Sequence, residues 1–201
     1  LKSLIDFKSE VSVDEISRCL TSRGLEVEAV KNLSEGFEKV ITVKILKKDQ
    51  HPNADRLSFC TVTTNGSDAL GIVCGATNMK AGDVVALAQI GAKLPNGLEI
   101  KKSSIRGVES NGMLCSESEL GLSDSSEGII IFPEGTKLGE KVSQVLGRND
   151  VVLTLNVTPN RGDCLSHLGI AREVVAAVGH VDDSFIRRTI RSVPWCGWNQ
   201  V

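Results

Sequence analysis

Hydrophobic and polar residues alternate in short runs through the middle of this chain, and glycine-containing turns separate the runs. The alternation has a period of two at residues 70–74, 84–88 and 98–100. A period of two places successive side chains on opposite faces of a strand, whereas a helix requires a period of about 3.6. The pattern therefore predicts a small β-barrel made of short strands.

Five strands are expected in this barrel, which is typical of the OB class of Greek-key barrels. The expected strands cover residues 40–45, 57–61, 70–74, 84–88 and 100–105, with a last rung at 113–115. A long turn is expected at 49–56, and Asn65-Gly66 predicts a two-residue hairpin turn because such a pair readily adopts positive φ. Pro95-Asn96-Gly97 predicts a second tight turn. Residues 129–132 and a short helical pattern at 142–146 are expected to close the barrel.

Helical periodicity appears before and after the barrel. Ser12 and Glu15 form a capping-box pattern at the start of an amphipathic helix that ends at Gly24, and an alternating strand follows at 25–29. After the barrel, a strand at 153–157 leads through a turn into a second helix. The apolar face expected for this helix contains Leu165, Leu168, Ala171, Val175 and Val178.

Neither of these flanking segments is long enough to bury its own apolar face, so we expect them to pack together. The predicted fold class is therefore α+β, with a five-stranded OB-type β-barrel inserted into a small discontinuous α+β unit. The expected domains are 1–34 with 148–180 for the α+β unit, 35–147 for the barrel and 181–201 for an unassigned tail. The tail contains both tryptophans and is either the start of another domain or sequence foreign to the rest.

The composition of the chain favours a cytoplasmic protein. The formal net charge of −2 excludes a global attraction to nucleic acid or anionic lipid, so any such binding depends on a local patch. The six cysteines include no C-x-x-C pair and the three histidines lack metal-ligand spacing, so we expect reduced thiols and no metal site. No apolar run reaches the roughly 18 residues that span a bilayer, so no membrane segment is expected.

Four motifs occur along the chain in a characteristic order. They are H-P-N-A-D-R-L at 51–57, I-V-C-G-A-T-N at 72–78, I-R-G-V-E-S-N-G-M-L-C-S at 105–116 and V-T-P-N-R-G-D-C-L-S at 157–166. Up to about residue 179, the chain resembles the amino-terminal region of the bacterial phenylalanyl-tRNA synthetase β-subunit family. The first three motifs also suit other tRNA-binding OB domains, and the fourth singles out this family.

The resemblance implies a part of an ATP-dependent ligase that joins phenylalanine to its tRNA. In that family the enzyme is an α2β2 assembly with its aminoacylation site in the α subunit, so tRNA and the α subunit are the implied partners. ATP and magnesium are implied for the whole enzyme, and no cofactor is expected in this chain. The sequence has no phosphate-cradling glycine loop and no nucleophile elbow, so we predict no catalytic residue and no metal ligand.

The barrel segment carries balanced charge, with 12 Lys and Arg against 13 Asp and Glu between residues 38 and 147. Its densest basic cluster consists of Lys93, Lys101, Lys102 and Arg106. This cluster predicts phosphate contacts with RNA, but a solvated strand edge whose lysines discourage edge-to-edge pairing is an open alternative. The resemblance implies further RNA contacts at Arg56, Asn78, Met79, Ser110 and Met113.

Two other groups have a structural interpretation beside a functional one. His51 precedes Pro52 and can reach a phosphate, but we favour a turn-capping role together with Asn53 and Asp55. Arg161 and Asp163 can pair across their own turn, and we favour that role over a catalytic one.

Two classes of function remain open for this sequence. In the first, the chain is a non-catalytic tRNA-binding module of the ligase β subunit, with weak and largely sequence-independent affinity. In the second, it is a structural and interaction scaffold of that subunit with little RNA affinity. A free-standing tRNA-binding OB protein is a further alternative. Base stacking has little support, because the barrel segment contains three aromatic residues, Phe37, Phe59 and Phe132.

Overall fold

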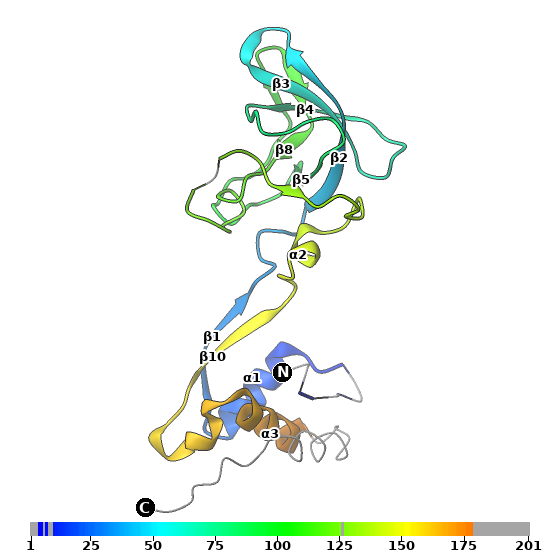
Figure 1. Cartoon of the computed structure of the whole chain (residues 1–201). Coiled ribbons are helices and arrows are strands. Elements are labelled where there is room, and N and C mark those ends of the chain that lie inside the picture. Colours follow the sequence, from blue (N-terminus) through cyan, green and yellow to red (C-terminus); the bar gives the residue numbers. More distant parts are fainter. Residues whose placement is uncertain (1–3, 6, 8–9, 126, 179–201) are drawn as a thin grey trace, which may run out of the picture. The chain divides into compact units, whose positions relative to one another are not determined.

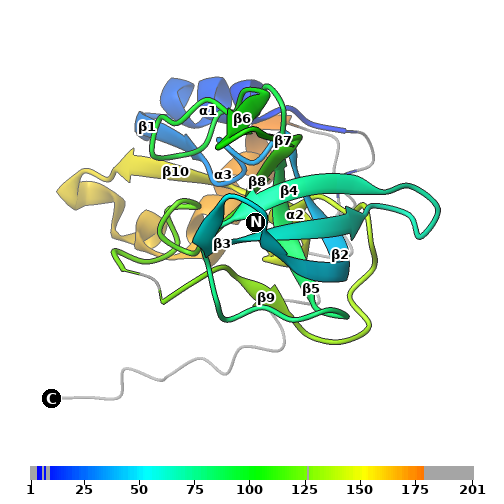
Figure 2. The same cartoon turned by 90° about the horizontal axis from the view of Figure 1, so that it is seen from above.

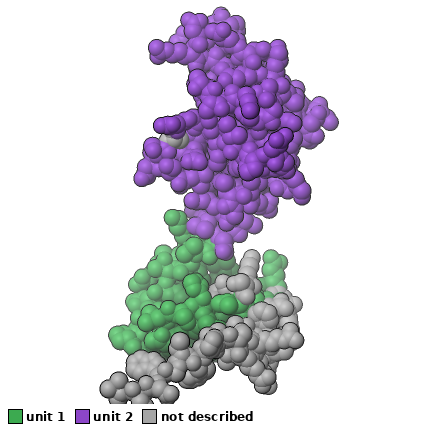
Figure 3. Space-filling view, in the orientation of Figure 1, with its two compact units in different colours: residues 1–31, 151–201 green, residues 32–150 purple. Residues whose placement is uncertain are grey.

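The chain folds into two compact units, which Figure 3 shows in different colours. The computed structural model describes residues 4, 5, 7, 10–125 and 127–178, so the tail expected at 181–201 lies outside the described residues. One unit combines residues up to 31 with residues from 151 onward, and the other contains residues 32–150. The domain boundaries that the sequence suggests, at 34/35 and 147/148, stay a prediction.

The second unit is built around one antiparallel sheet (Figure 1). Its strands are β2 (Val40–His51), β3 (Ala54–Thr63), β4 (Leu70–Cys74), β5 (Val84–Gln89), β8 (Gly112–Leu114) and β9 (Ile131–Phe132). Their order is β4-β3-β2-β5-β8, with β9 also paired to β5, and Figure 2 shows β4, β3, β2 and β5 following one another in this order. The N–H of Asn111 donates to the carbonyl of Gly71 at 3.0 Å, which links β4 to the segment entering β8. The sheet is therefore a nearly closed five-stranded barrel, and the predicted OB-type fold class is confirmed.

Strand β5 is the central element of this unit because both of its faces are buried. Val85 and Leu87 point into the barrel with Val43 and Ile72, whereas the alternate residues of β5 contribute to a second apolar cluster. That second cluster contains Phe37, Leu94, Ile100, Leu120, Phe132 and Val142. It is covered by the loops after β5 and by the short helix α2 (Val142–Val145). Burial on both faces explains why β5 is a continuous apolar run.

Two of the turns differ from the sequence-based expectation. The long turn expected at 49–56 is wrong, because β2 continues to His51 and β3 begins at Ala54. The two-residue turn expected at Asn65-Gly66 is also wrong, because residues 64–69 separate β3 from β4. In that loop the carboxylate of Asp68 accepts hydrogen bonds from the hydroxyls of Thr64 and Thr63 and from two backbone N–H groups. These bonds hold the pKa of Asp68 well below its ordinary value.

The barrel strand expected at 100–105 is also wrong, because no strand of the barrel sheet covers these residues. Ile100 is buried but lies in a loop, and β6 (Ser103–Ile105) pairs with β7 (Val108–Ser110) in a separate hairpin. The place beside β5 is taken by β8, which was expected only as a last rung. The available signal for this hairpin is Gly107, which readily adopts the positive φ that the second position of a two-residue turn requires.

The first unit contains α1 (Val13–Ser22), β1 (Glu26–Asn32), β10 (Val151–Asn156), the 3-10 helix η1 (Pro159–Leu165) and α3 (His167–Val178). The hydroxyl of Ser12 accepts the N–H of Glu15 at 3.1 Å, as the capping pattern predicts. Strand β1 pairs with β10, and the apolar faces of α1 and α3 form one core that includes Leu20, Leu25, Ile170 and Val174. The expected apolar face is wrong at Leu165, which ends η1 and is 77% exposed.

Candidate nucleic-acid interface

Two loops of the barrel that are far apart in sequence meet at one place, which we call the loop junction (residues 51–53 and 105–107). The imidazole of His51 is buried, with 3% of the residue exposed, and its Nε2 lies 3.1 Å from the carbonyl oxygen of Ile105. Its Nδ1 accepts the N–H of Asn53 at 3.1 Å. The side-chain amide of Asn53 donates to the carbonyl of Arg106 at 3.0 Å. Three hydrogen bonds therefore define the junction. The predicted turn-capping role of His51 is confirmed for its bond to Asn53, whereas the part expected of Asp55 stays a prediction.

The tip of the β6–β7 hairpin presents Arg106 to solvent. Ile105 pairs with Val108, so Arg106 and Gly107 form the two-residue turn. Their φ angles of 49° and 88° place both residues in the left-handed region that this type of hairpin turn requires. Among the described residues, Arg106 is the single non-glycine residue with positive φ. The guanidinium has no ion pair in the described part of the chain, so its charge is available to a ligand.

Arg56 belongs to β3 and lies three residues after Asn53 in the sequence. In the β2–β3 ladder Gln50 pairs with Ser58 but His51 pairs with Ala54, so residues 55–57 bulge without partners in β2. Arg56 is exposed in this bulge and, like Arg106, forms no ion pair with a described residue. Bulges often redirect side chains at the rim of a barrel. Arg56 and Arg106 are therefore both exposed and without an ion pair among the described residues.

The predicted lysine cluster is less available than its sequence suggests. The ammonium of Lys101 lies 3.2 Å from a carboxylate oxygen of Glu99, and that of Lys102 lies 2.9 Å from Glu109. Both pairs are exposed, so each contributes little to stability, but each acid competes with a phosphate for its lysine. Lys93 forms a backbone bridge with Glu99, and its exposed side chain makes no ion pair with a described residue.

The four remaining candidates contribute to the fold itself. Asn78 holds Ile129 at both backbone groups, accepting its N–H at 3.1 Å and donating to its carbonyl at 2.8 Å. Ser110 is buried, accepts the N–H of Val73 at 3.1 Å and donates to the carbonyl of Gly112 at 2.9 Å. Met79 lies in the barrel core, and Met113 is partly buried against the second apolar cluster. The burial of Ser110 and Met79 is at odds with a direct RNA contact by either side chain.

The aromatic residues of the barrel also differ in availability. Phe37 and Phe132 belong to the buried core, whereas Phe59 is partly exposed on β3. The ring of Phe59 lies over Gly71, where a Cβ atom would approach it to 2.6 Å. A glycine at position 71 is therefore needed for this ring to lie flat against β4.

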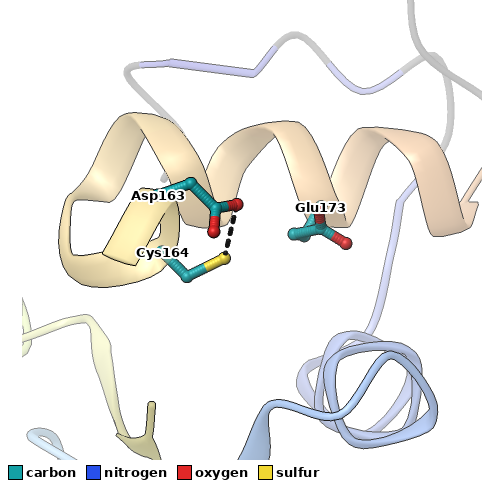
Figure 4. Close-up of side chains that lie close together, drawn as sticks. All are labelled: Asp163, Cys164 and Glu173. Carbon is teal, nitrogen blue, oxygen red and sulfur yellow. Dashed lines mark hydrogen bonds between the residues drawn. The ribbon is translucent and has the colours of Figure 1, made fainter. Parts of the chain in front are cut away.

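A different polar group occupies the first unit, where Asp163, Cys164 and Glu173 come together (Figure 4). Their ligand atoms lie within 4.8 Å of one another, the arrangement that a metal ion requires. The guanidinium of Arg161 already fills this position, with Nη2 at 3.1 Å from Asp163, 2.8 Å from Glu173 and 2.9 Å from the sulfur of Cys164. Burial raises the pKa of the Cys164 thiol, which disfavours the thiolate that would bind a metal.

Arg161 is thus the centre of an ion-pair network rather than a metal site. The predicted pair with Asp163 is confirmed, and hydrogen bonds from Arg161 lower the pKa of Asp163 to about 2. The network extends through Glu173 to Arg23, whose guanidinium also donates to the carbonyl of Ala176 at 2.8 Å. It therefore joins the end of α1 to η1 and α3.

Sequence reasoning missed both long-range bonds of the loop junction. His51 and Ile105 are separated by 54 positions, and Asn53 and Arg106 by 53. The first and third motifs contain these residues, but no local pattern shows that the two motifs touch.

None of the helices in the part of the chain that the structure describes has the length and apolar character needed to span a membrane.

The chain is similar to known proteins both in its barrel and over most of its length. Residues 40–141 match a family model described as "Putative tRNA binding domain". Over 179 residues the chain is 54% identical to the phenylalanine–tRNA ligase β subunit of Geobacter metallireducens, covering 89% of this chain and 22% of that protein. It is 50% identical over 176 residues to the β subunit of Fusobacterium nucleatum, covering 88% and 22%. The chain thus spans about a fifth of the length of these relatives, and the resemblance predicted from the four motifs is confirmed.

Proposed function

The chain belongs to the tRNA-binding-domain family, and on that premise we propose that its barrel binds tRNA as part of a phenylalanine–tRNA ligase β subunit. One observation carries the proposal: the loop junction presents Arg56 and Arg106 as exposed cations without ion-pair partners among the described residues. Arginine is well suited to phosphate because its planar guanidinium donates two parallel hydrogen bonds.

The contact is electrostatic and weak. Arg56, Arg106 and Lys93 supply about three phosphate contacts, and Lys101 and Lys102 add to them only where a phosphate displaces Glu99 or Glu109. Contacts to phosphate position a nucleic acid without reading its sequence. The barrel therefore discriminates little among tRNAs, and selection of the cognate tRNA belongs to other parts of the enzyme.

The remaining attributes of the enzyme are proposed for the whole assembly. A phenylalanine–tRNA ligase requires ATP and magnesium, and this β subunit joins an α subunit in an α2β2 assembly in the cytoplasm. Among the described residues the one metal-like group is filled by Arg161, so ATP and magnesium are assigned to segments outside them. The chain by itself is therefore inactive in aminoacylation.

A tRNA titration of the purified chain at several salt concentrations tests the proposal. With about three phosphates neutralised, the slope of log affinity against log salt is about −2 for single-stranded and nearer −3 for duplex regions. Binding should weaken by roughly 15- to 60-fold between 50 and 200 mM salt. Absence of binding at 50 mM salt, or tight binding that ignores salt, contradicts the proposal.

A scaffold function is the second candidate, and the internal roles of Asn78 and Ser110 favour it. Both lie in motifs shared with tRNA-binding domains, yet their polar atoms are occupied by backbone groups of the barrel. On this alternative the motifs preserve the loop structure, and the titration gives no binding at low salt.

A further inference from the structure

The hydrogen bonds of the loop junction determine the tautomer of His51. The group facing Nδ1 is the backbone N–H of Asn53, which can only donate, so Nδ1 must be unprotonated. The group facing Nε2 is the backbone carbonyl of Ile105, which can only accept, so Nε2 must carry the hydrogen. The structure therefore requires neutral His51 with its proton on Nε2.

The same bonds control the geometry of the hairpin tip. The carbonyls of two consecutive residues, Ile105 and Arg106, are held by His51 and Asn53 respectively. Between them the backbone of Arg106 adopts a φ of 49°, a conformation that non-glycine residues adopt rarely and that needs support from its surroundings. Loss of either bond frees the segment that carries the Arg106 side chain.

We propose that His51 and Asn53 are positioning residues for RNA binding, which hold the hairpin tip that carries Arg106. The inference rests on the proposed tRNA-binding function. A side chain at position 51 that cannot accept from Asn53 and donate to Ile105 would leave the hairpin tip without this support.

Loss of these bonds would remove Arg106 from its position, so RNA binding should weaken. The log–log salt slope should decrease in magnitude by about one, the share of one phosphate contact.

The test is a set of tRNA titrations over a range of salt concentrations at pH 7.5, with circular dichroism showing that each variant stays folded. His51→Phe and Asn53→Ala should each reduce the magnitude of the log–log salt slope by about one, because each removes a bond that holds the hairpin tip. His51→Gln should keep the wild-type slope, because a glutamine can accept from Asn53 and donate to Ile105. His167→Gln, which changes a histidine of the other unit, should also keep it.

Two outcomes overturn the inference alone: a wild-type salt slope in both His51→Phe and Asn53→Ala, and a reduced slope in His51→Gln. Absence of tRNA binding by wild type at pH 7.5 overturns the proposed function and this inference with it. Nitrogen NMR of His51 separates these cases, because it reports the tautomer without RNA. The Nδ1-protonated tautomer at pH 7.5 would refute the positioning role directly.

Discussion

The loop junction of the barrel and the Arg161 network of the first unit solve the same structural problem in different ways. Each joins segments that are far apart in sequence. The network uses charges that neutralise one another, since Arg161 contacts Asp163 and Glu173 and Glu173 also pairs with Arg23. The junction uses neutral hydrogen bonds to backbone carbonyls and leaves Arg56 and Arg106 unpaired among the described residues.

The difference separates structural charge from charge that is available for binding. A guanidinium surrounded by carboxylates has satisfied its donors and offers little to a phosphate. A guanidinium held in place through its own backbone keeps all of its donors free for a ligand. Counting arginines and lysines in the sequence does not make this distinction, because it depends on which neighbours the fold supplies.

The largest expected effect concerns the close approach of η1 to α3 in the first unit. A Cβ atom at Gly169 would collide with the backbone carbonyl of Asp163 and lie 3.1 Å from the Cα of Cys164. Gly169→Ala should therefore destabilise the chain by about 3 kcal/mol, the upper end of overpacking effects. Chemical denaturation followed by circular dichroism measures this value.

Gly162→Ala is the matched control, because nothing lies within 4 Å of the added Cβ atom. Its effect should stay within about 0.5 kcal/mol. Equal stability of the two variants would show that the Arg161 network does not require close packing of η1 on α3.

The next effect concerns the free cations of the junction. Exchange of Arg56 and Arg106 to Gln together should lower the magnitude of the salt slope for tRNA binding by about two. Exchange of Lys101 and Lys102 to Gln removes the same charge, but Glu99 and Glu109 already compete for these lysines, so the slope should change by less than about one. A larger effect from the lysine pair would reverse the comparison.

A smaller effect follows from the pKa of Asp163, which Arg161 lowers from 3.8 to about 2. A carboxyl with a lowered folded-state pKa stabilises the fold above its unfolded value, and this stability is lost as pH falls from about 4 towards 2. Asp163→Asn should therefore unfold at a urea midpoint that declines less than that of wild type between pH 5 and pH 2. Glu28→Gln, an exposed carboxyl on β1, should decline like wild type.

The smallest expected signal is enzymatic. Neither the loop junction nor the Arg161 network contains a nucleotide-binding motif, so the purified chain should show no phenylalanine-dependent exchange of pyrophosphate into ATP. Exchange above the level of a no-enzyme blank would show that an adenylate forms on this chain. One of the two regions would then have a catalytic role in addition to binding or structural support.

Local sequence patterns determined many of the secondary-structure elements of this protein and its family. Neighbouring residues determine local structure, so the strand at β5, the cap at Ser12 and the pair of Arg161 with Asp163 are predictable from the sequence. The four motifs identify the family in the same way, because each motif is contiguous.

Tertiary structure alone decided which residues of those motifs and of the basic cluster are available to a ligand. Asn78 is used by Ile129, which is 51 positions away, and Lys102 is used by Glu109 on β7. The meeting of His51 with Ile105 depends on how the β6–β7 hairpin folds against the end of β2, and no local pattern shows this. Side chains separated by about 50 residues acquire partners only in the folded chain, so the free and the occupied cations look alike in the sequence and differ in the fold.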